Sequence, residues 1–302
     1  MNLCEICDNP LNENNQYCLN CLIIICESKL DNYKDKDKII IPVLRKIDSN
    51  NNQLTRIQKK VITYVQKKSK IESDKSYLPL LSKIKSYGYT ENDLKILSDY
   101  IKNEAPIIIH FNIINTLEKL VNDTCYRNTL EVNNKGKSYN DSRKNWEDNL
   151  FNNLYYLSTP QERVKYGVLN ITNDPNGVSC CYGYGDSYLL LKNVRFRTTF
   201  ANQDTSCLNT KVSTCEFYNH VLLEYNLKEL SSMIKIAHKI VPFVSSKVTN
   251  VYKEVQIHGN IELNRDIEAI VVNKKYSDDT KILGLLETFK NKNNCNVIWM
   301  EE

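Results

Sequence analysis

The sequence predicts an α+β protein, with helices in its first half and a mostly antiparallel sheet in its second half. Three observations support this class: amphipathic helical segments come first, strand-like segments follow from about residue 165, and no βαβ alternation or internal repeat appears. The chain has 302 residues, 41% of them apolar and 25% charged. That composition is typical of a soluble globular protein with one large domain or two smaller ones.

Helical periodicity defines the elements expected in the first half. Ile57, Val61 and Val65 recur at helical spacing and form one apolar stripe. Thr90 and Asp141 are residue types that cap helix N-termini, so each predicts the start of a helix. The predicted helices span 54–68, 77–88, 90–104, 112–123 and 142–157.

The second half is rich in short runs of β-branched and aromatic residues, which favour strands. Two helices are expected between them, at 216–224 and 227–240, and a further helix at 279–292. The predicted strands span 166–171, 187–192, 195–200, 251–257, 267–272 and 295–299.

Four cysteines near the start of the chain have the spacing of a metal site. They form two Cys-x2-Cys pairs, Cys4 with Cys7 and Cys18 with Cys21. Two such pairs complete a tetrahedral shell of thiolates, and with no open coordination position the favoured interpretation is a structural zinc ion. Free cysteines and a rubredoxin-type iron centre are the alternatives.

The cysteine pattern also divides the chain and suggests its compartment. Residues 1–26 are predicted to form the zinc module, 27–53 a linker, and 54–302 the helical and α+β domain. The chain has eleven cysteines and no evident secretory signal, so a cytoplasmic or nuclear protein is expected. Its formal charge of +4 is too small to imply a polyanionic partner by itself.

The stretch "YKEVQIHG" (252–259) departs from the usual pattern of a half-buried strand. Glu254 and Gln256 are two residues apart, so they place a carboxylate and an amide on one face. The alternatives are a solvated strand face and a functional site. His258 continues the same face, either as a general base or as a structural hydrogen-bonding group.

Over residues 105–272 the chain resembles an uncharacterised domain family of bacteria and large DNA viruses. The segment that follows Tyr126 and Arg127 departs from that family, because it contains less glycine than usual. The resemblance is carried, in order along the chain, by "APIIIHFN", "CYRNTLE", "RKNWEDNLF", "ERVKYGVLNI", "YGDSYLLLK", "RFRTTF" and "EVQIHGNIELNRDIEAIVV".

A more distant resemblance is to the ADP-ribosyltransferases, which are α+β proteins that hold NAD in a cleft. Their signature is a Tyr/His-Arg pair, a hydroxyl-bearing strand and a strand with a catalytic glutamate. The resemblance implies that 105–302 is the catalytic part, with Glu254 and Gln256 as catalytic residues. It implies NAD-binding roles for Tyr126 and Arg127, for Ser187, and for Thr198 and Thr199.

The chemistry of these residue types suits that role, although each has a simpler interpretation. An arginine binds a pyrophosphate through charge-assisted bonds, and a carboxylate stabilises the cation that forms when nicotinamide leaves the ribose. Arg127 is alternatively a surface ion pair, and Ser187 part of a turn. Trp146 is expected in a helical core stripe, and Arg143 is expected to pair with Glu147 one turn away on the helix surface. A cleft-lining role for Trp146 and Glu147 is the alternative.

Two functional hypotheses follow. The first is an NAD-dependent ADP-ribosyltransferase that modifies a macromolecular target, with the zinc module contributing to target or partner binding. The second is a non-catalytic, zinc-containing protein that binds protein or nucleic acid, using the lysine-rich helix predicted within 54–70.

Overall fold

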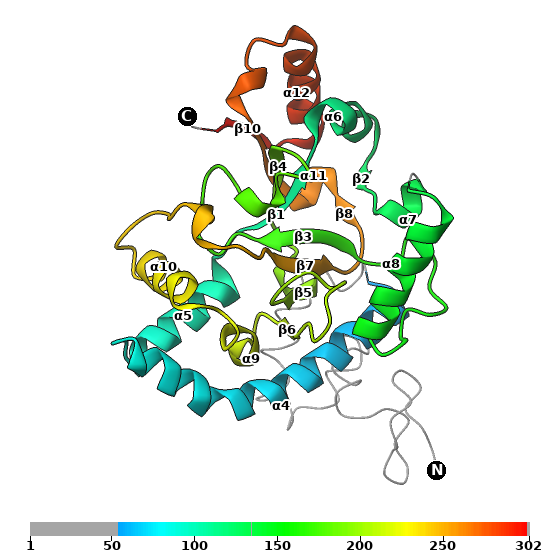
Figure 1. The fold of residues 1–302 in the computed structure, drawn as a ribbon. Coiled ribbons are helices and arrows are strands. Elements are labelled where there is room, and N and C mark those ends of the chain that lie inside the picture. Colours follow the sequence, from blue (N-terminus) through cyan, green and yellow to red (C-terminus); the bar gives the residue numbers. More distant parts are fainter. Residues whose placement is uncertain (1–53, 134, 301–302) are drawn as a thin grey trace, which may run out of the picture.

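A computed structural model describes residues 54–133 and 135–300. It confirms a mixed α+β architecture, with a helical first part and a large, mostly antiparallel sheet (Figure 1). The four cysteines predicted to bind zinc, the 1–26 module and the 27–53 linker lie outside the described residues, so these remain predictions. No helix within the described ranges is long and apolar enough to cross a bilayer.

The central sheet has eight strands in the order β10-β9-β4-β1-β3-β7-β5-β6. All neighbours are antiparallel except the pair of β9 and β10 at one edge. A separate two-stranded sheet joins β2 (Cys125–Tyr126) to β8 (Ile261–Glu262). The strands of the large sheet are β1 (Ile107–Phe111), β3 (Lys165–Leu169), β4 (Ser187–Leu191), β5 (Thr198–Ala201), β6 (Val212–Thr214), β7 (Lys253–Ile257), β9 (Ile267–Val272) and β10 (Asn296–Trp299).

Helices surround the sheet in three groups (Figure 1). The first comprises α4 (Arg56–Ser86), α5 (Glu91–Asn103), α9 (Asn219–Leu222) and α10 (Leu227–Ala237). The second comprises α6 (Ile113–Asn122) and α12 (Thr280–Asn293), which pack together, with the short α11 (Leu263–Asp266) nearby. The third comprises α7 (Thr129–Val132) and α8 (Lys137–Leu150), at the right of the view.

The two helices predicted at 54–68 and 77–88 are one continuous helix, α4. Thr55 caps its start by accepting a hydrogen bond from the Gln58 backbone, and Pro79 lies inside it. Proline normally interrupts a helix because it lacks an N–H donor. Burial of Leu80, Leu81 and Ile84 on the far side of the proline offsets that loss.

The predicted start of the helix expected at 142–157, which is α8 in the structure, is wrong. Asp141 lies within α8, which begins at Lys137 after Gly136 and ends at Leu150 instead of residue 157. Gly136 has a positive φ of 84°, a conformation that glycine adopts without steric cost. The glycine therefore begins the helix five residues earlier than the aspartate suggested.

The sheet contains a strand that sequence patterning did not identify. β1 lies between β4 and β3, and its burial pattern shows no alternation, since all five residues are buried. A continuous apolar run does not distinguish a strand from a buried helix by periodicity. The predicted strand 195–200 is also shorter, because residues Arg195–Arg197 form a 3₁₀ turn before β5.

Alternation along β7 divides the two faces of the sheet. Val255 and Ile257 pack into the main apolar core with residues of α4, α5, α6, α10 and α12. Glu254 and Gln256 therefore point to the opposite face, where β7 is nonetheless fully buried. The interpretation of this face as solvated is wrong, so its polar side chains need partners within the fold.

Candidate functional site

The polar face of β7 continues across its two neighbouring strands. Glu254 is opposite Val168 of β3, while Gln256 lies between Tyr166 of β3 and Thr199 of β5. Directly opposed residues in a sheet share one face, so these side chains form adjacent rows. This arrangement brings a carboxylate, an amide, a phenol and a hydroxyl together.

A cavity of about 390 Å³ opens over this part of the sheet, and Glu254 lines it. The volume lies within the range of small-molecule and cofactor sites. Helix α8, the segment between β1 and α8, and the loop after β5 supply the other walls. Six aromatic side chains contribute to the lining: Tyr126, Tyr139, Trp146, Tyr166, Tyr184 and Tyr252.

The two carboxylate oxygens of Glu254 have different surroundings. Oε1 accepts hydrogen bonds from the Thr205 hydroxyl at 2.6 Å and from the Gln256 amide at 3.1 Å. No described residue donates a hydrogen bond to Oε2. This oxygen is nevertheless absent from the set of fully buried atoms without a partner, so it retains some accessible surface. One oxygen is thus held by the protein, and the other is open to the cavity.

The environment of Glu254 makes it titrate near neutral pH. Burial raises its pKa to about 7, because a desolvated carboxylate is penalised. The Thr205 hydrogen bond and the charge of Arg143 act in the opposite direction. Perturbed carboxyl groups in a cavity are candidates for functional residues, and this one also has the required access.

Arg143 of α8 contributes a guanidinium group to the lining of this cavity. Its guanidinium carbon lies 3.6 Å from the centroid of the Tyr166 ring and 6.0 Å from that of Trp146. No carboxylate of the described residues lies within salt-bridge distance of it. A cation stacked on aromatic rings keeps its N–H donors available, which suits recognition of an anion.

A second carboxylate, Asp204, enters the cavity from the loop after β5. Burial opposes its ionisation, but hydrogen bonds from Tyr252 and from the Ser206 backbone outweigh that effect and lower its pKa. The cavity therefore holds one carboxyl group that titrates near neutrality and one that stays ionised. Paired carboxyls with separated pKa values often divide acid–base roles.

The structure brings only some of the predicted site residues together. Tyr126 lines the cavity with Glu254, whereas Arg127 does not. Arg127 pairs with Asp123 at 2.9 Å and with Glu131 at 3.4 Å, which is the ion-pair alternative. The arginine that faces Glu254 is Arg143 instead.

The three predicted hydroxyl residues are buried and do not line the cavity. Ser187 accepts a backbone hydrogen bond from Asn273, and Thr198 donates to the carbonyl of Val194. Thr199 donates to the side-chain oxygen of Gln256 at 2.9 Å. The hydroxyl that contacts the glutamate belongs to Thr205, on a loop that the sequence pattern did not single out.

The expected pairing along α8 is replaced by longer-range contacts. Glu147 bonds Arg163 at 3.1 Å, and Arg163 also pairs with Asp148, all three being buried. Glu147 therefore forms its ion pair with Arg163 instead of Arg143. Trp146 lines the cavity, which agrees with the cleft-lining alternative and not with the favoured core stripe.

The segment "YGYGD" (182–186) packs against the cavity, and its Tyr184 lines it. Gly185 lies so close to β1 that an added Cβ would be 1.9 Å from the Phe111 carbonyl carbon. Its carbonyl accepts a hydrogen bond from His110 Nδ1, while His110 Nε2 accepts one from the Val178 backbone. Burial lowers the pKa of His110 to about 4, so this histidine is a neutral structural link.

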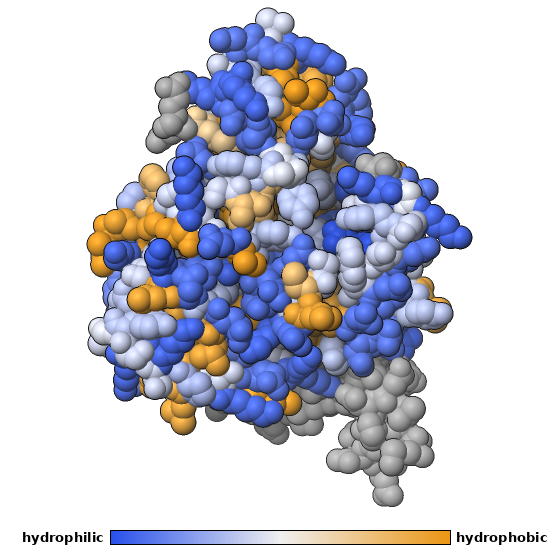
Figure 2. Space-filling view, in the orientation of Figure 1, coloured by the Kyte–Doolittle hydropathy of each residue, from blue (hydrophilic) through white to orange (hydrophobic). Residues whose placement is uncertain are grey.

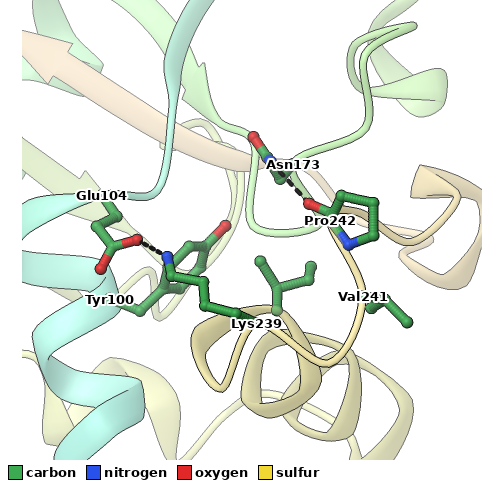
Figure 3. A pocket seen from close by; sticks show the side chains of 7 residues that line it. Tyr100, Glu104, Asn173, Lys239, Val241 and Pro242 are labelled. Carbon is green, nitrogen blue, oxygen red and sulfur yellow. Dashed lines mark hydrogen bonds and ion pairs between the residues drawn. The ribbon is translucent and has the colours of Figure 1, made fainter.

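A second hollow near α5 and α10 provides a contrast (Figure 3). Its polar groups have partners within the hollow: Lys239 forms an ion pair with Glu104, and the Asn173 amide donates a hydrogen bond to the Pro242 carbonyl. The loop after α10 also exposes the apolar side chains of Ile240 and Phe243, and Figure 2 shows apolar surface at the left of the molecule. These groups offer no unpartnered cation comparable to Arg143.

Among the residues that the structure describes, neither a metal-ligating cluster nor the basic helix lines the cavity. Within residues 54–133 and 135–300 there is no cluster of three or more His, Cys, Asp or Glu side chains arranged to hold a metal ion. Helix α4 packs on α9 and β6, and none of its residues lines the cavity. Cys181 does line it, whereas its neighbour Cys180 is exposed.

Comparison with known proteins gives limited similarity. No curated protein matches the chain. Among solved structures, "Thermosipho africanus DarTG in complex with ADP-ribose" aligns with a TM-score of 0.33 and 12% identity, over 64% of this chain and 49% of that chain. The chain thus spans about half the length of that protein. Within the predicted 105–272 stretch, residues 109–232 match the model of a family described as "Protein of unknown function (DUF3626)".

Proposed function

We propose that this cavity binds NAD and that the protein transfers its ADP-ribosyl group to a macromolecular acceptor. The observation that carries the proposal is that one cavity contains both the Oε2 atom of Glu254, which accepts no hydrogen bond, and the guanidinium of Arg143, which has no carboxylate partner among the described residues. NAD presents a diphosphate, a ribose and flat rings. Arginine, carboxylate and aromatic side chains respectively recognise these groups.

The roles of the side chains follow from the chemistry of the bond that breaks. The N-glycosidic bond cleaves, and nicotinamide departs with the electron pair while positive charge develops on the ribose. The acceptor then bonds to the ribose carbon and loses a proton. Ionised Glu254 stabilises the developing cation, and Arg143 holds the diphosphate in place of the predicted Arg127.

Stacking supports the orientation of the nucleotide. Tyr139 and Trp146 lie on α8 with Arg143, whereas Tyr184 and Tyr252 lie with Asp204. Aromatic rings contribute binding energy without specifying the acceptor. That the acceptor is a macromolecule therefore rests on the resemblance to ADP-ribosyltransferases.

Nicotinamide release from NAD by the purified full-length chain tests the proposal. We expect release above pH 7, where Glu254 is ionised, and loss of release in Glu254→Gln. ADP-ribose should also raise the melting temperature of the wild-type protein. If the protein shows no nicotinamide release and ADP-ribose does not raise its melting temperature, the proposal is overturned and the non-catalytic binding protein is favoured.

A further inference from the structure

A chain of hydrogen bonds runs along the buried polar face from Glu254 away from the cavity. Gln256 donates to Glu254, Thr199 contacts the Gln256 side-chain oxygen at 2.9 Å, and His258 Nε2 lies 3.2 Å from the Thr199 hydroxyl. The Tyr155 hydroxyl lies 2.7 Å from His258 Nδ1. All five side chains are buried, so water does not compete for these bonds.

With Glu254 ionised and the Gln256 amide nitrogen directed at it, only one direction of donation satisfies every link of this chain. His258 is neutral, because burial lowers its pKa to about 3. If Nε2 accepted from Thr199, the threonine proton would be used there and the Gln256 oxygen would lose its donor. Tyr155 therefore donates to Nδ1, Nε2–H donates to Thr199, and Thr199 donates to Gln256.

We infer that Tyr155, His258 and Thr199 are positioning residues, which fix the Gln256 amide so that it presents N–H to Glu254 Oε1. Glu254 is thereby aimed with Oε2 toward the cavity. A reversed amide would place its oxygen at 3.1 Å from a carboxylate oxygen, where the two repel. The catalytic consequence rests on the proposed function, whereas the arrangement of the side chains does not.

Glu254 has other neighbours that a test must hold constant. Arg143 faces it from α8 and Asp204 from the loop after β5, and both influence its ionisation. The titratable side chains that also sense its charge are Tyr166 on β3, Tyr184 and Cys181 before β4, and Tyr252 before β7. None of these belongs to the hydrogen-bond chain, so substitutions at Thr199 leave them unchanged.

Thr199 offers a matched pair of substitutions. Thr199→Val removes the hydroxyl with little change of shape, whereas Thr199→Ser keeps it. Full-length protein labelled with ¹³C at the glutamate carboxyl carbon reports the ionisation of Glu254, with Glu254→Gln assigning its signal. Thr199→Ala replaces Thr199→Val if the valine variant does not fold.

Loss of the donor to Gln256 frees the amide to turn, so the carboxylate loses a hydrogen bond. We expect Thr199→Val to raise the titration midpoint of Glu254 by about one pH unit and Thr199→Ser to leave it unchanged. At pH 6 the ionised fraction, and with it nicotinamide release, should fall roughly tenfold in Thr199→Val, with little change in KM.

The two readouts separate the inference from the proposed function. A shifted midpoint in a protein that never cleaves NAD would support the positioning chain and overturn the enzymatic proposal. A folded Thr199→Val or Thr199→Ala variant with the wild-type midpoint would overturn the positioning chain, even if the wild-type protein releases nicotinamide.

Discussion

Arg127 and Arg143 occupy contrasting positions in the same part of the chain. Arg127 is held by Asp123 and Glu131 outside the cavity, whereas Arg143 lies over the Tyr166 ring inside it. An arginine whose donors are occupied by carboxylates contributes mainly to local structure. One that stacks on an aromatic ring and keeps its donors free is prepared for an anionic ligand.

Removing the carboxylate opposite Arg143 should give the largest effect. Glu254→Gln is expected to slow nicotinamide release by about 100- to 1,000-fold, because the developing cation loses its charged partner. The measurement is kcat at pH 8 by nicotinamide detection. Glu268→Gln, on an exposed position of β9 in the same sheet, is the control and should retain wild-type kcat.

The two arginines provide a direct test of their different positions. Arg143→Ala should weaken ADP-ribose binding by about 10- to 100-fold, because it removes charge-assisted bonds to the diphosphate. Arg127→Ala should change the Kd by less than about twofold. Calorimetric titration with ADP-ribose measures both, and an equal loss in the two variants would contradict the assignment.

Burial of Glu254 predicts a pH-dependent cost to stability. Its pKa rises from 4.5 to about 7 on folding, so its favourable contribution is complete below pH 4.5 and is lost as pH rises through 7. Relative to the wild-type protein, Glu254→Gln should gain on the order of 3 kcal/mol of unfolding free energy between pH 4.5 and 8.

Urea denaturation of both proteins across this pH range measures the difference. Glu147, whose pKa burial also raises to about 7, is present in both proteins and cancels from the comparison. A constant difference between the two unfolding free energies would show that Glu254 ionises normally, and would weaken its assignment as the desolvated carboxylate of the cavity.

The predicted zinc module should have the smallest effect on the cavity. Replacing Cys4 and Cys7 by serine should abolish a zinc content of about one ion per chain, measured by elemental analysis. ADP-ribose affinity should change by less than about twofold, because the side chains proposed to bind the nucleotide, Glu254 and Arg143, lie outside the predicted zinc module. Loss of nucleotide binding in this variant would connect the module to the site.

Sequence patterning anticipated the elements whose signals are local. The helix at Glu91–Asn103 follows the Thr90 cap, and the last helix follows Asp279. The strand β1 was missed because complete burial removes alternation, and α8 was misplaced because Gly136 begins it before Asp141. Local propensity does not report which elements a strand or helix will meet.

The same distinction applies to the site. The pairing of Glu254 with Gln256 on one buried face follows from their spacing, and Tyr126 does line the cavity. Arg143 was assigned to Glu147 because helix spacing permits that pair, whereas the sequence gives no sign that Arg163 captures Glu147. A residue's competing partners are set by tertiary contacts.

A crystal structure of the full-length protein with ADP-ribose would show whether this cavity binds the nucleotide. We expect the diphosphate within hydrogen-bonding distance of the Arg143 guanidinium and the ribose within reach of Glu254 Oε2. Nucleotide bound at another surface, with this cavity unoccupied at saturating ADP-ribose, would contradict it.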